Sequence, residues 1–205
     1  MKRIFVTGIS TEVGKTIASA IIVEALEADY WKPVQAGDLD RSDSHKVRNL
    51  ISNTKTVIHP NSYALKTPMS PHAAAEIDGI EIAKENIMEP RTDNHLVIEG
   101  AGGLLVPLND TDTIADLIKT NYKVVVVSRH YLGSINHSLL TIEALRARGM
   151  EPVILFSGAE HPTTESIILS KTGIRCIGRI PEEDHFNREV IRKYASAFRN
   201  SLIAL

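Results

Sequence analysis

The stretch GISTEVGKT, residues 8–16, decides the fold class because of the segments on either side of it. Residues 2–7 are rich in Ile, Phe and Val, which is typical of a strand, and residues 16–28 are dense in Ala, Ile, Val and Leu, which is typical of a helix. A strand, a glycine-containing loop and a helix in this order predict a phosphate-binding loop. Five residues lie between Gly8 and Gly14 where the common motif has four, and the alternative is a chance Gly-Lys-Thr at a helix start.

Each part of this loop has a physical role in binding phosphate. Glycines let the chain turn so that successive backbone N–H groups point inward, and the N-terminus of the following helix adds partial positive charge. Lys15 is placed to reach the β- and γ-phosphates, and the hydroxyl group of Thr16 is placed to bind Mg²⁺. The loop therefore predicts a protein that binds a nucleoside triphosphate.

The alternation of strand and helix continues along the chain. Apolar runs predict strands at residues 95–99, 122–128, 151–156 and 173–178, and longer stretches predict helices at residues 43–51, 80–88, 113–120, 134–148, 163–172 and 186–205. The strands are apolar throughout, as expected for strands buried on both faces. We therefore predict an α/β fold with a doubly wound, mostly parallel sheet and helices on both faces, like that of P-loop NTPases. The absence of repeats and linkers predicts one domain, residues 1–205.

The composition is that of an ordinary soluble domain. The chain has 205 residues, 43% of them hydrophobic, and 23 Lys and Arg residues nearly balance 25 Asp and Glu residues. The net charge of −2 gives no basic surface for nucleic acid, and no apolar window is long enough to cross a membrane. Cys176 is the only cysteine, so an intramolecular disulfide is excluded and a cytoplasmic location is expected. Its place in an apolar run predicts a core thiol.

Three charged residues outside the loop are candidates for the site. Glu99 ends a predicted strand and precedes Gly-Ala-Gly-Gly, which places a carboxylate at the sheet edge where ligands bind in open α/β folds; the alternative is a surface turn. Asp43 lies in a polar loop and is either a metal ligand, a helix N-cap or a solvated side chain. Lys32 follows Trp31 at a strand end, and is either solvated or a second cation near the phosphates.

Two other segments leave alternatives open. Residues 53–71 contain three prolines and little periodicity, which predicts an irregular excursion that covers the sheet edge or forms part of a site. The C-terminal helix combines an apolar face with the basic residues Arg188, Arg192, Lys193 and Arg199. We interpret it as a helix docked on the sheet, and the alternative is a membrane-surface helix.

Several ordered motifs together resemble the dethiobiotin synthetase family, the ATP-dependent enzymes of biotin synthesis that close the ureido ring. They are VTGISTEVGKT at residues 6–16, WKPVQAG at 31–37, SD at 42–43, VIEGAGGLLVPL at 97–108, LGSINHSLLT at 132–141 and GRIP at 178–181. The motifs comprise 46 of the 205 residues and are spread along the chain from residue 6 to residue 181. The phosphate loop alone is not specific to the family, whereas TEVGKT, KPV and EGAGG in series are.

The resemblance implies a cytoplasmic homodimer in which 7,8-diaminononanoate, CO₂ and MgATP yield dethiobiotin, ADP and phosphate. A substrate amine becomes a carbamate, the γ-phosphoryl group moves to a carbamate oxygen to give a carbamic-phosphoric anhydride, and the second amine closes the ring. The protein's contribution to such a reaction is mainly positioning and charge stabilisation.

The family's functional residues carry over onto matching positions. Lys32 and Lys15 would be the catalytic lysines, and Thr16, Asp43 and Glu99 would hold the metal. The nucleotide would be bound by Glu12, Val13, Gly14, Lys15, Thr16, Ile17, Asp43, Glu99, Gly100, Ala101, Gly102, Ser157, Pro181, Glu182 and Glu183. The diamine would contact Thr11, Lys32 and Ala36, and its carboxylate tail would be received by the partner subunit through Leu132, Gly133, Ser134 and Asn136.

Two residues depart from the family pattern. Ala36 stands where a hydroxyl-bearing residue usually contacts the substrate, so one hydrogen bond is missing or moved. Ser157 stands where an asparagine often reads the adenine, which leaves base selectivity open.

The strongest rival function is a partition or positioning switch ATPase of the deviant P-loop kind. Those proteins carry an additional lysine early in the loop, and no lysine lies between Gly8 and Gly14. The related cobyrinate-type amide synthases need a glutaminase domain with a nucleophilic cysteine, which the length of the chain and the placement of Cys176 disfavour. A GTPase is excluded because the chain has no Asn-Lys-x-Asp motif.

Overall fold

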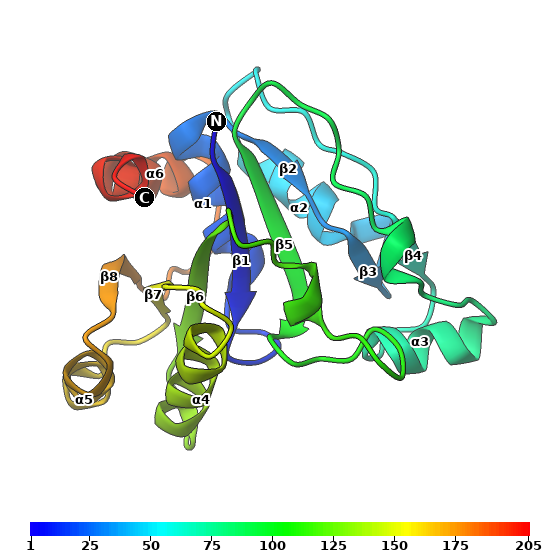
Figure 1. Ribbon diagram of the computed structural model, residues 1–205. Coiled ribbons are helices and arrows are strands. Elements are labelled where there is room, and N and C mark those ends of the chain that lie inside the picture. The colour runs from blue at the N-terminus through cyan, green and yellow to red at the C-terminus, as the bar shows by residue number, and fades with distance from the viewer.

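The computed structural model describes residues 1–205 and contains a six-stranded parallel sheet (Figure 1). Its spatial order is β2-β5-β1-β6-β7-β8, with all adjacent pairs parallel. The strands are β1 (Arg3–Gly8), β2 (Asp29–Trp31), β5 (Leu96–Gly103), β6 (Lys123–Arg129), β7 (Val153–Ser157) and β8 (Arg175–Ile180). A small second sheet pairs β3 (Val34–Ala36) with β4 (Tyr63–Leu65). The order in the main sheet reverses at β1, so the predicted doubly wound α/β fold is confirmed.

Helices cover both faces of the sheet. Successive β7 residues point in opposite directions: Leu155 belongs to the large core that α1 (Lys15–Leu26) and α6 (Arg188–Ile203) join, whereas Phe156 belongs to a small cluster under α4 (Ser134–Arg146) and α5 (Pro162–Thr172). The other helices are α2 (Asp43–Leu50) and α3 (Pro71–Asp78), with short 3-10 turns η1 (Leu39–Arg41), η2 (Lys84–Asn86) and η3 (Ile114–Leu117).

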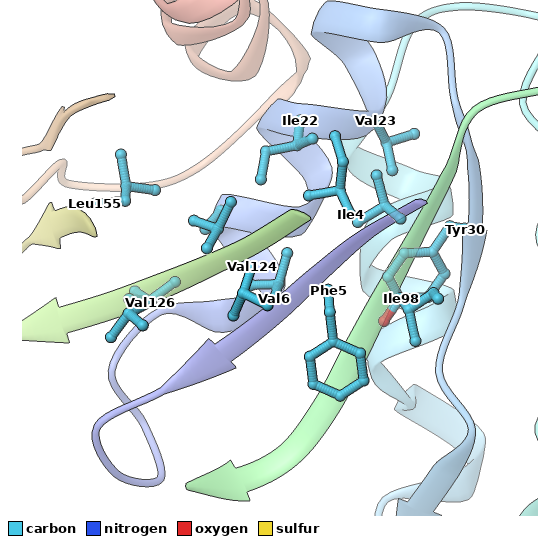
Figure 2. Packing of buried hydrophobic residues seen from close by; sticks show 14 of the residues in the cluster. Ile4, Phe5, Val6, Ile22, Val23, Tyr30, Ile98, Val124, Val126 and Leu155 are labelled. Atoms are coloured by element: carbon cyan, nitrogen blue, oxygen red, sulfur yellow. The ribbon is translucent and has the colours of Figure 1, made fainter. Parts of the chain in front are cut away.

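The centre of the sheet is buried on both sides, which explains why its strands are continuously apolar. In β1, Ile4 and Val6 lie on the side of Ile22 in α1, and Phe5 points to the opposite face (Figure 2). All three β1 side chains are fully buried. Strand β1 therefore lies between two packed layers, and the loop that follows it starts from a fixed position.

Two helix predictions were wrong in place or type. The helix predicted at residues 80–88 is only the turn η2, and a helix forms at α3 instead. Its boundaries follow from Pro71 in the first turn and from Gly79, which ends it at a φ of 67°. Residues 113–120 form only the turn η3, closed by a capping box between Thr113 and Asp116.

The irregular segment covers the edge of the sheet, as predicted. Ile58 forms a parallel bridge to Tyr30 in the edge strand β2, and β4 pairs with β3. The end of the segment, residues 68–71, lines the cleft described below. Both roles expected for residues 53–71 are therefore present in one segment.

The C-terminal helix α6 is docked on the protein. Its apolar face is buried through Ile191, Tyr194, Phe198 and Leu202. Two of its basic residues bind backbone carbonyls, Arg199 that of Ala25 at 2.7 Å and Arg188 that of Asn49 at 3.0 Å. None of the helices has the length and apolar character needed to traverse a bilayer.

Cys176 is exposed, so the prediction of a core thiol was wrong. It lies in β8, the last strand of the sheet, whose outer edge has no neighbouring strand. Only Ile177 and Ile180 of this strand are buried. An apolar run at a sheet edge does not bury every side chain, and the sequence alone does not identify which strand is at the edge.

Candidate functional site

The phosphate loop connects the end of β1 to the start of α1. Glu12 and Gly14 have φ angles of 57° and 91°, in the left-handed region. The backbone N–H groups of residues 12–17 have no acceptor in the protein, and they include the first donors of α1. A side chain at Gly8 would meet Val13 at 2.6 Å, so this position requires glycine. The local geometry is that of a cradle of N–H donors for an anion.

A cleft of about 1270 Å³ opens above this loop at the carboxyl ends of the parallel strands. Open α/β sheets bind ligands at this edge. Most of the residues that the sequence analysis assigned to the site line the cleft: Thr11, Glu12, Gly14, Lys15, Thr16, Ile17, Lys32, Ala36, Asp43, Glu99, Ala101, Gly102, Ser157, Pro181, Glu182 and Glu183.

A buried cluster of charges lies at the centre of the cleft. Lys32 Nζ is 2.5 Å from Asp43 Oδ2 and 3.2 Å from Glu99 Oε1. The hydroxyl groups of Thr16 and Tyr30 donate to the two oxygens of Glu99, each at 2.9 Å. Glu99 is 1% exposed and accepts three hydrogen bonds, so its carboxylate is held in one orientation.

The cluster keeps its lysine charged. Burial opposes the charged form of Lys32, but Glu99 and Asp43 outweigh it and raise the pKa of Lys32 above its ordinary value. Burial likewise opposes the charged form of Asp43, and the Lys32 ammonium lowers the pKa of Asp43 to about 2. Burial lowers the pKa of Lys15 to about 8, with Glu99 acting in the opposite direction. Lys15 Nζ donates to the carbonyl of Ser10 at 2.9 Å.

The oxygen donors around this cluster fit magnesium. The carboxylates of Asp43 and Glu99 contact Lys32, and the hydroxyl of Thr16 donates to Glu99 beside the phosphate loop. Hard oxygen ligands of this kind are those that Mg²⁺ takes in sites shared with a nucleotide phosphate. Asp43 is the first residue of α2, and the N-cap is Ser42, so the alternative reading of Asp43 as an N-cap was wrong.

Several expected residues lie outside the cleft lining. Val13 belongs to the phosphate loop, but its side chain is buried. A side chain at Gly100 would meet Phe5 and Ile114 in the core. The remaining four residues lie at or just before the start of α4: Leu132, Gly133, Ser134 and Asn136. The side chain of Leu132 is fully exposed.

The structure adds lining residues that the sequence analysis missed. They are Gln35, Asp38, Lys46, Asn49, Leu50, Pro68, Met69, Ser70, Pro71, Val106, Arg129, Gly158, Ile180 and Phe186. Gln35 stands within the WKPVQAG motif, and its side-chain oxygen accepts from the backbone N–H of Asp43 at 3.3 Å. Most of the others come from separate loops and helix ends, which carry no local motif.

The fold and the loop define a nucleotide-binding protein of the P-loop class. A family profile described as AAA domain matches residues 2–190. The ATP-dependent dethiobiotin synthetase BioD of Christiangramia forsetii is 59% identical over 202 residues, which cover 98% of each chain. That of Cytophaga hutchinsonii is 50% identical and covers 95% of this chain and 96% of its own. The chain belongs to the dethiobiotin synthetase family.

Solved structures show the same fold in proteins of distant sequence. A putative plasmid partition protein from Borrelia burgdorferi, bound to AMPPNP, covers 100% of this chain and 99% of its own with a TM-score of 0.63. Its sequence identity is 14%, so the likeness concerns the fold alone.

Proposed function

We propose that the protein catalyses the ATP-dependent formation of dethiobiotin from 7,8-diaminononanoate and CO₂. The observation that carries the proposal is the placement of Lys15, Lys32, Asp43 and Glu99 around one cleft at the phosphate loop. Membership of the family and the high identity to named dethiobiotin synthetases support the choice of substrate.

The proposed reaction has three bond-making steps. One substrate amine attacks CO₂, loses a proton and becomes a carbamate. A carbamate oxygen then attacks the γ-phosphorus of ATP, ADP leaves, and a carbamic-phosphoric anhydride results. The second amine attacks the carbonyl carbon, phosphate leaves with the C–O bond electrons, and the ureido ring closes after loss of a proton.

The two lysines contribute positive charge at different places. Lys15 follows the N–H cradle and faces the β- and γ-phosphates in the proposed complex. Lys32 is held as an ammonium by two carboxylates, so it acts as a fixed cation and not as a base. A fixed cation stabilises the charge that develops on the carbamate and on the transferring phosphoryl group.

Thr16, Asp43 and Glu99 would hold Mg²⁺, whose bound charge neutralises the phosphate oxygens. Tyr30 fixes the orientation of Glu99 through the hydrogen bond to Oε2. The protein's own contribution is thus a rigid carboxylate beside the loop, supported by a fully buried tyrosine.

The remaining walls divide the cleft between the two substrates. The nucleotide would be bound by the loop residues Glu12, Val13, Gly14 and Ile17, by the main chain of Gly100, Ala101 and Gly102, and at the base end by Pro181, Glu182 and Glu183. We place the diamine near Thr11 and Ala36, on the side of residues 68–71. Ala36 offers no hydroxyl there, so neighbouring groups such as Ser70 and Thr11 are the available hydrogen-bonding side chains.

We further propose a homodimer in which the partner subunit completes the substrate site. Leu132, Gly133, Ser134 and Asn136 lie outside the cleft of their own subunit. Leu132 and the neighbouring Tyr131 and Ile135 are exposed, which is unusual for large apolar side chains gathered at one helix start. The N-terminus of α4 and the Asn136 amide would receive the substrate carboxylate.

A switch ATPase is the alternative, and two observations disfavour it. The loop has no lysine between Gly8 and Gly14. The apolar face of α6 is buried in the protein and does not offer a free surface to a membrane.

ADP release with single substrates omitted tests the proposal. We expect ADP release only when diamine and bicarbonate are both present, because phosphoryl transfer needs the carbamate as acceptor. Lys15→Ala should abolish ADP release. The matched control Lys123→Ala changes an exposed lysine at the amino end of β6, away from the cleft, and should keep the wild-type rate. Equal ADP release without the diamine would contradict the proposal and favour a switch ATPase.

A further inference from the structure

Ser157 contacts the phosphate loop directly. It is the last residue of β7, and its side-chain hydroxyl donates to the Val13 carbonyl with an O···O distance of 2.6 Å. Ser157 is 6% exposed and Val13 2%, so this hydrogen bond is shielded from water. The Val13 carbonyl has no other partner in the protein, because the N–H groups of α1 do not reach it. The hydroxyl of Ser157 is therefore committed to the loop.

This hydrogen bond fixes the direction of the next N–H group. The Val13 carbonyl and the Gly14 N–H belong to the same peptide unit, and the chain has no cis peptide bond. In a trans peptide the C=O and N–H vectors point in opposite directions. Because the carbonyl points toward Ser157, the Gly14 N–H points away from β7, and it has no acceptor in the protein. Gly14 itself lines the cleft.

The loop needs such a support because its conformation is strained. Glu12 and Gly14 both have left-handed φ angles, which a non-glycine residue such as Glu12 rarely adopts. Within residues 10–14, the other hydrogen bonds come from Lys15 and Ala18, which belong to the adjoining helix α1. Ser157 supplies the one hydrogen bond to these residues from a different part of the chain, 144 positions away.

We propose that Ser157 is a positioning residue that orients the Val13–Gly14 peptide toward the nucleotide phosphates and does not read the base. The inference rests on the proposed binding of ATP at this loop. Without the hydroxyl, the buried Val13 carbonyl would be unpaired, and rotation of this peptide would relieve that cost by turning the Gly14 N–H out of the cradle. Every ligand with a triphosphate would then lose the same contact.

The test compares ligands that share the triphosphate and differ in the base. Binding of ATP, GTP, CTP and inorganic tripolyphosphate is measured by titration calorimetry with Mg²⁺ for the wild type, Ser157→Ala and Ser157→Thr. Ser128→Ala is the matched control, because Ser128 is a fully buried serine of the adjacent strand β6 whose hydroxyl pairs with Ser138 at 2.9 Å. Thermal unfolding of all variants is recorded in parallel.

We expect Ser157→Ala to weaken the binding of all four ligands by a common factor of about five to ten, the worth of one hydrogen bond. The ratio of ATP to GTP affinity should stay at its wild-type value, and Ser157→Thr should restore binding. Ser128→Ala should lower the melting temperature without changing any of these dissociation constants. Ser157→Cys, with a weak donor of similar size, replaces the alanine variant if that variant does not fold.

Two results would overturn the inference. One is a changed ATP to GTP ratio with unchanged tripolyphosphate binding, which would assign Ser157 to the base. The other is unchanged binding of every ligand in Ser157→Ala. Wild-type protein that binds neither ATP nor tripolyphosphate would instead refute the proposed function, so the two failures are distinguishable.

Discussion

Lys32 Nζ lies 3.2 Å from Glu99 Oε1, although the two residues are 67 positions apart in the chain. The register of the sheet explains the pairing. Trp31 in β2 is the parallel partner of Ile98 in β5, so the next residue of each strand meets at the same level. Parallel pairing thus places Lys32, the residue after β2, beside Glu99 within β5 and forms an ion pair next to the phosphate loop.

Glu99→Gln should remove the negative charge of this pair while keeping its shape. We expect turnover to fall by about a hundredfold or more, because the variant loses an electrostatic contact to the proposed phosphate-bound metal. Steady-state rates and thermal unfolding measured together separate chemistry from stability. Glu81→Gln, at an exposed position, is the control. Near wild-type turnover in a folded Glu99→Gln protein would remove Glu99 from the site.

Lys32→Ala should affect turnover far more than nucleotide affinity. The ammonium lies between Asp43 and Glu99, whereas the N–H cradle belongs to the loop and remains intact. We expect ATP binding within about threefold of wild type and a kcat lower by about a hundredfold or more. A variant with weak ATP binding and a normal kcat would assign Lys32 to the nucleotide.

Tyr30→Phe tests whether the orientation of Glu99 matters. The hydroxyl of Tyr30 is fully buried and donates to Glu99 Oε2. Removing it deletes one hydrogen bond to a charged group, worth about 1.5–3 kcal/mol. We expect a higher Mg²⁺ concentration for half-maximal activity at an unchanged fold. Tyr63→Phe, which alters a tyrosine that bonds Ala83 instead, should leave the Mg²⁺ dependence as in wild type.

The sequence predicted which residues meet at the centre of the candidate site because its signals are local. The strand–loop–helix order around Gly8 to Thr16 and the carboxylate of Glu99 at the end of an apolar run are patterns within short windows. The strand predicted to end at Glu99 continues to Gly103 in the structure. The contact from Tyr30 to Glu99 and that from Ser157 to Val13 join residues 69 and 144 positions apart, and no periodicity reports them. They became visible only with the register of the sheet.

The errors in the fold prediction have similar causes. The helix α3 carried its own signals, Ser70-Pro71 at the start and Gly79 at the end, but its short apolar pattern is weak. Residues 80–88, which were predicted to be helical, are held instead by tertiary contacts, such as the ion pair of Lys84 with Asp112 at 2.5 Å. The predicted burial of Cys176 was wrong for another reason. Edge strands and central strands have similar sequences, so the sequence did not show that this strand lies at the edge of the sheet.

Glu89 lies at the end of the sheet opposite the cleft and should make the stability of the protein depend on pH. Burial opposes its charge, but hydrogen bonds from Tyr122, Lys119 and Arg3 lower the pKa of Glu89 to about 2, from an ordinary value of 4.5. A depressed pKa stabilises the folded state above the ordinary value, and the contribution is lost as pH falls from about 4.5 toward 2.

Glu89→Gln should therefore destabilise the protein by about 1–3 kcal/mol at neutral pH, a range reduced for partial exposure of the carboxylate. Urea unfolding at pH 7 and pH 3 measures the difference, which should shrink at the lower pH. Glu76→Gln, on the exposed side of α3, serves as the control. An equal loss at both pH values would show that packing and not charge is responsible.

The proposed shared site predicts complementation between two defective subunits. In the proposed dimer each site takes Lys32 from one subunit and Asn136 from the other. Lys32→Ala and Asn136→Ala should therefore each be inactive alone, because each variant lacks one of these residues in both sites. After subunit exchange, mixed dimers contain one intact site, so about a quarter of the wild-type activity should return. Absence of recovery in confirmed mixed dimers would place Asn136 outside the shared site.

The most direct test of the proposed function is detection of the product by mass spectrometry. The wild-type protein is incubated with 7,8-diaminononanoate, isotopically labelled bicarbonate and MgATP, and the products are compared with those of Lys15→Ala. We predict dethiobiotin that carries the label in its ureido carbon, formed in equal amount with ADP and phosphate by the wild type alone. A protein that binds ATP but forms no labelled dethiobiotin would contradict the proposed function.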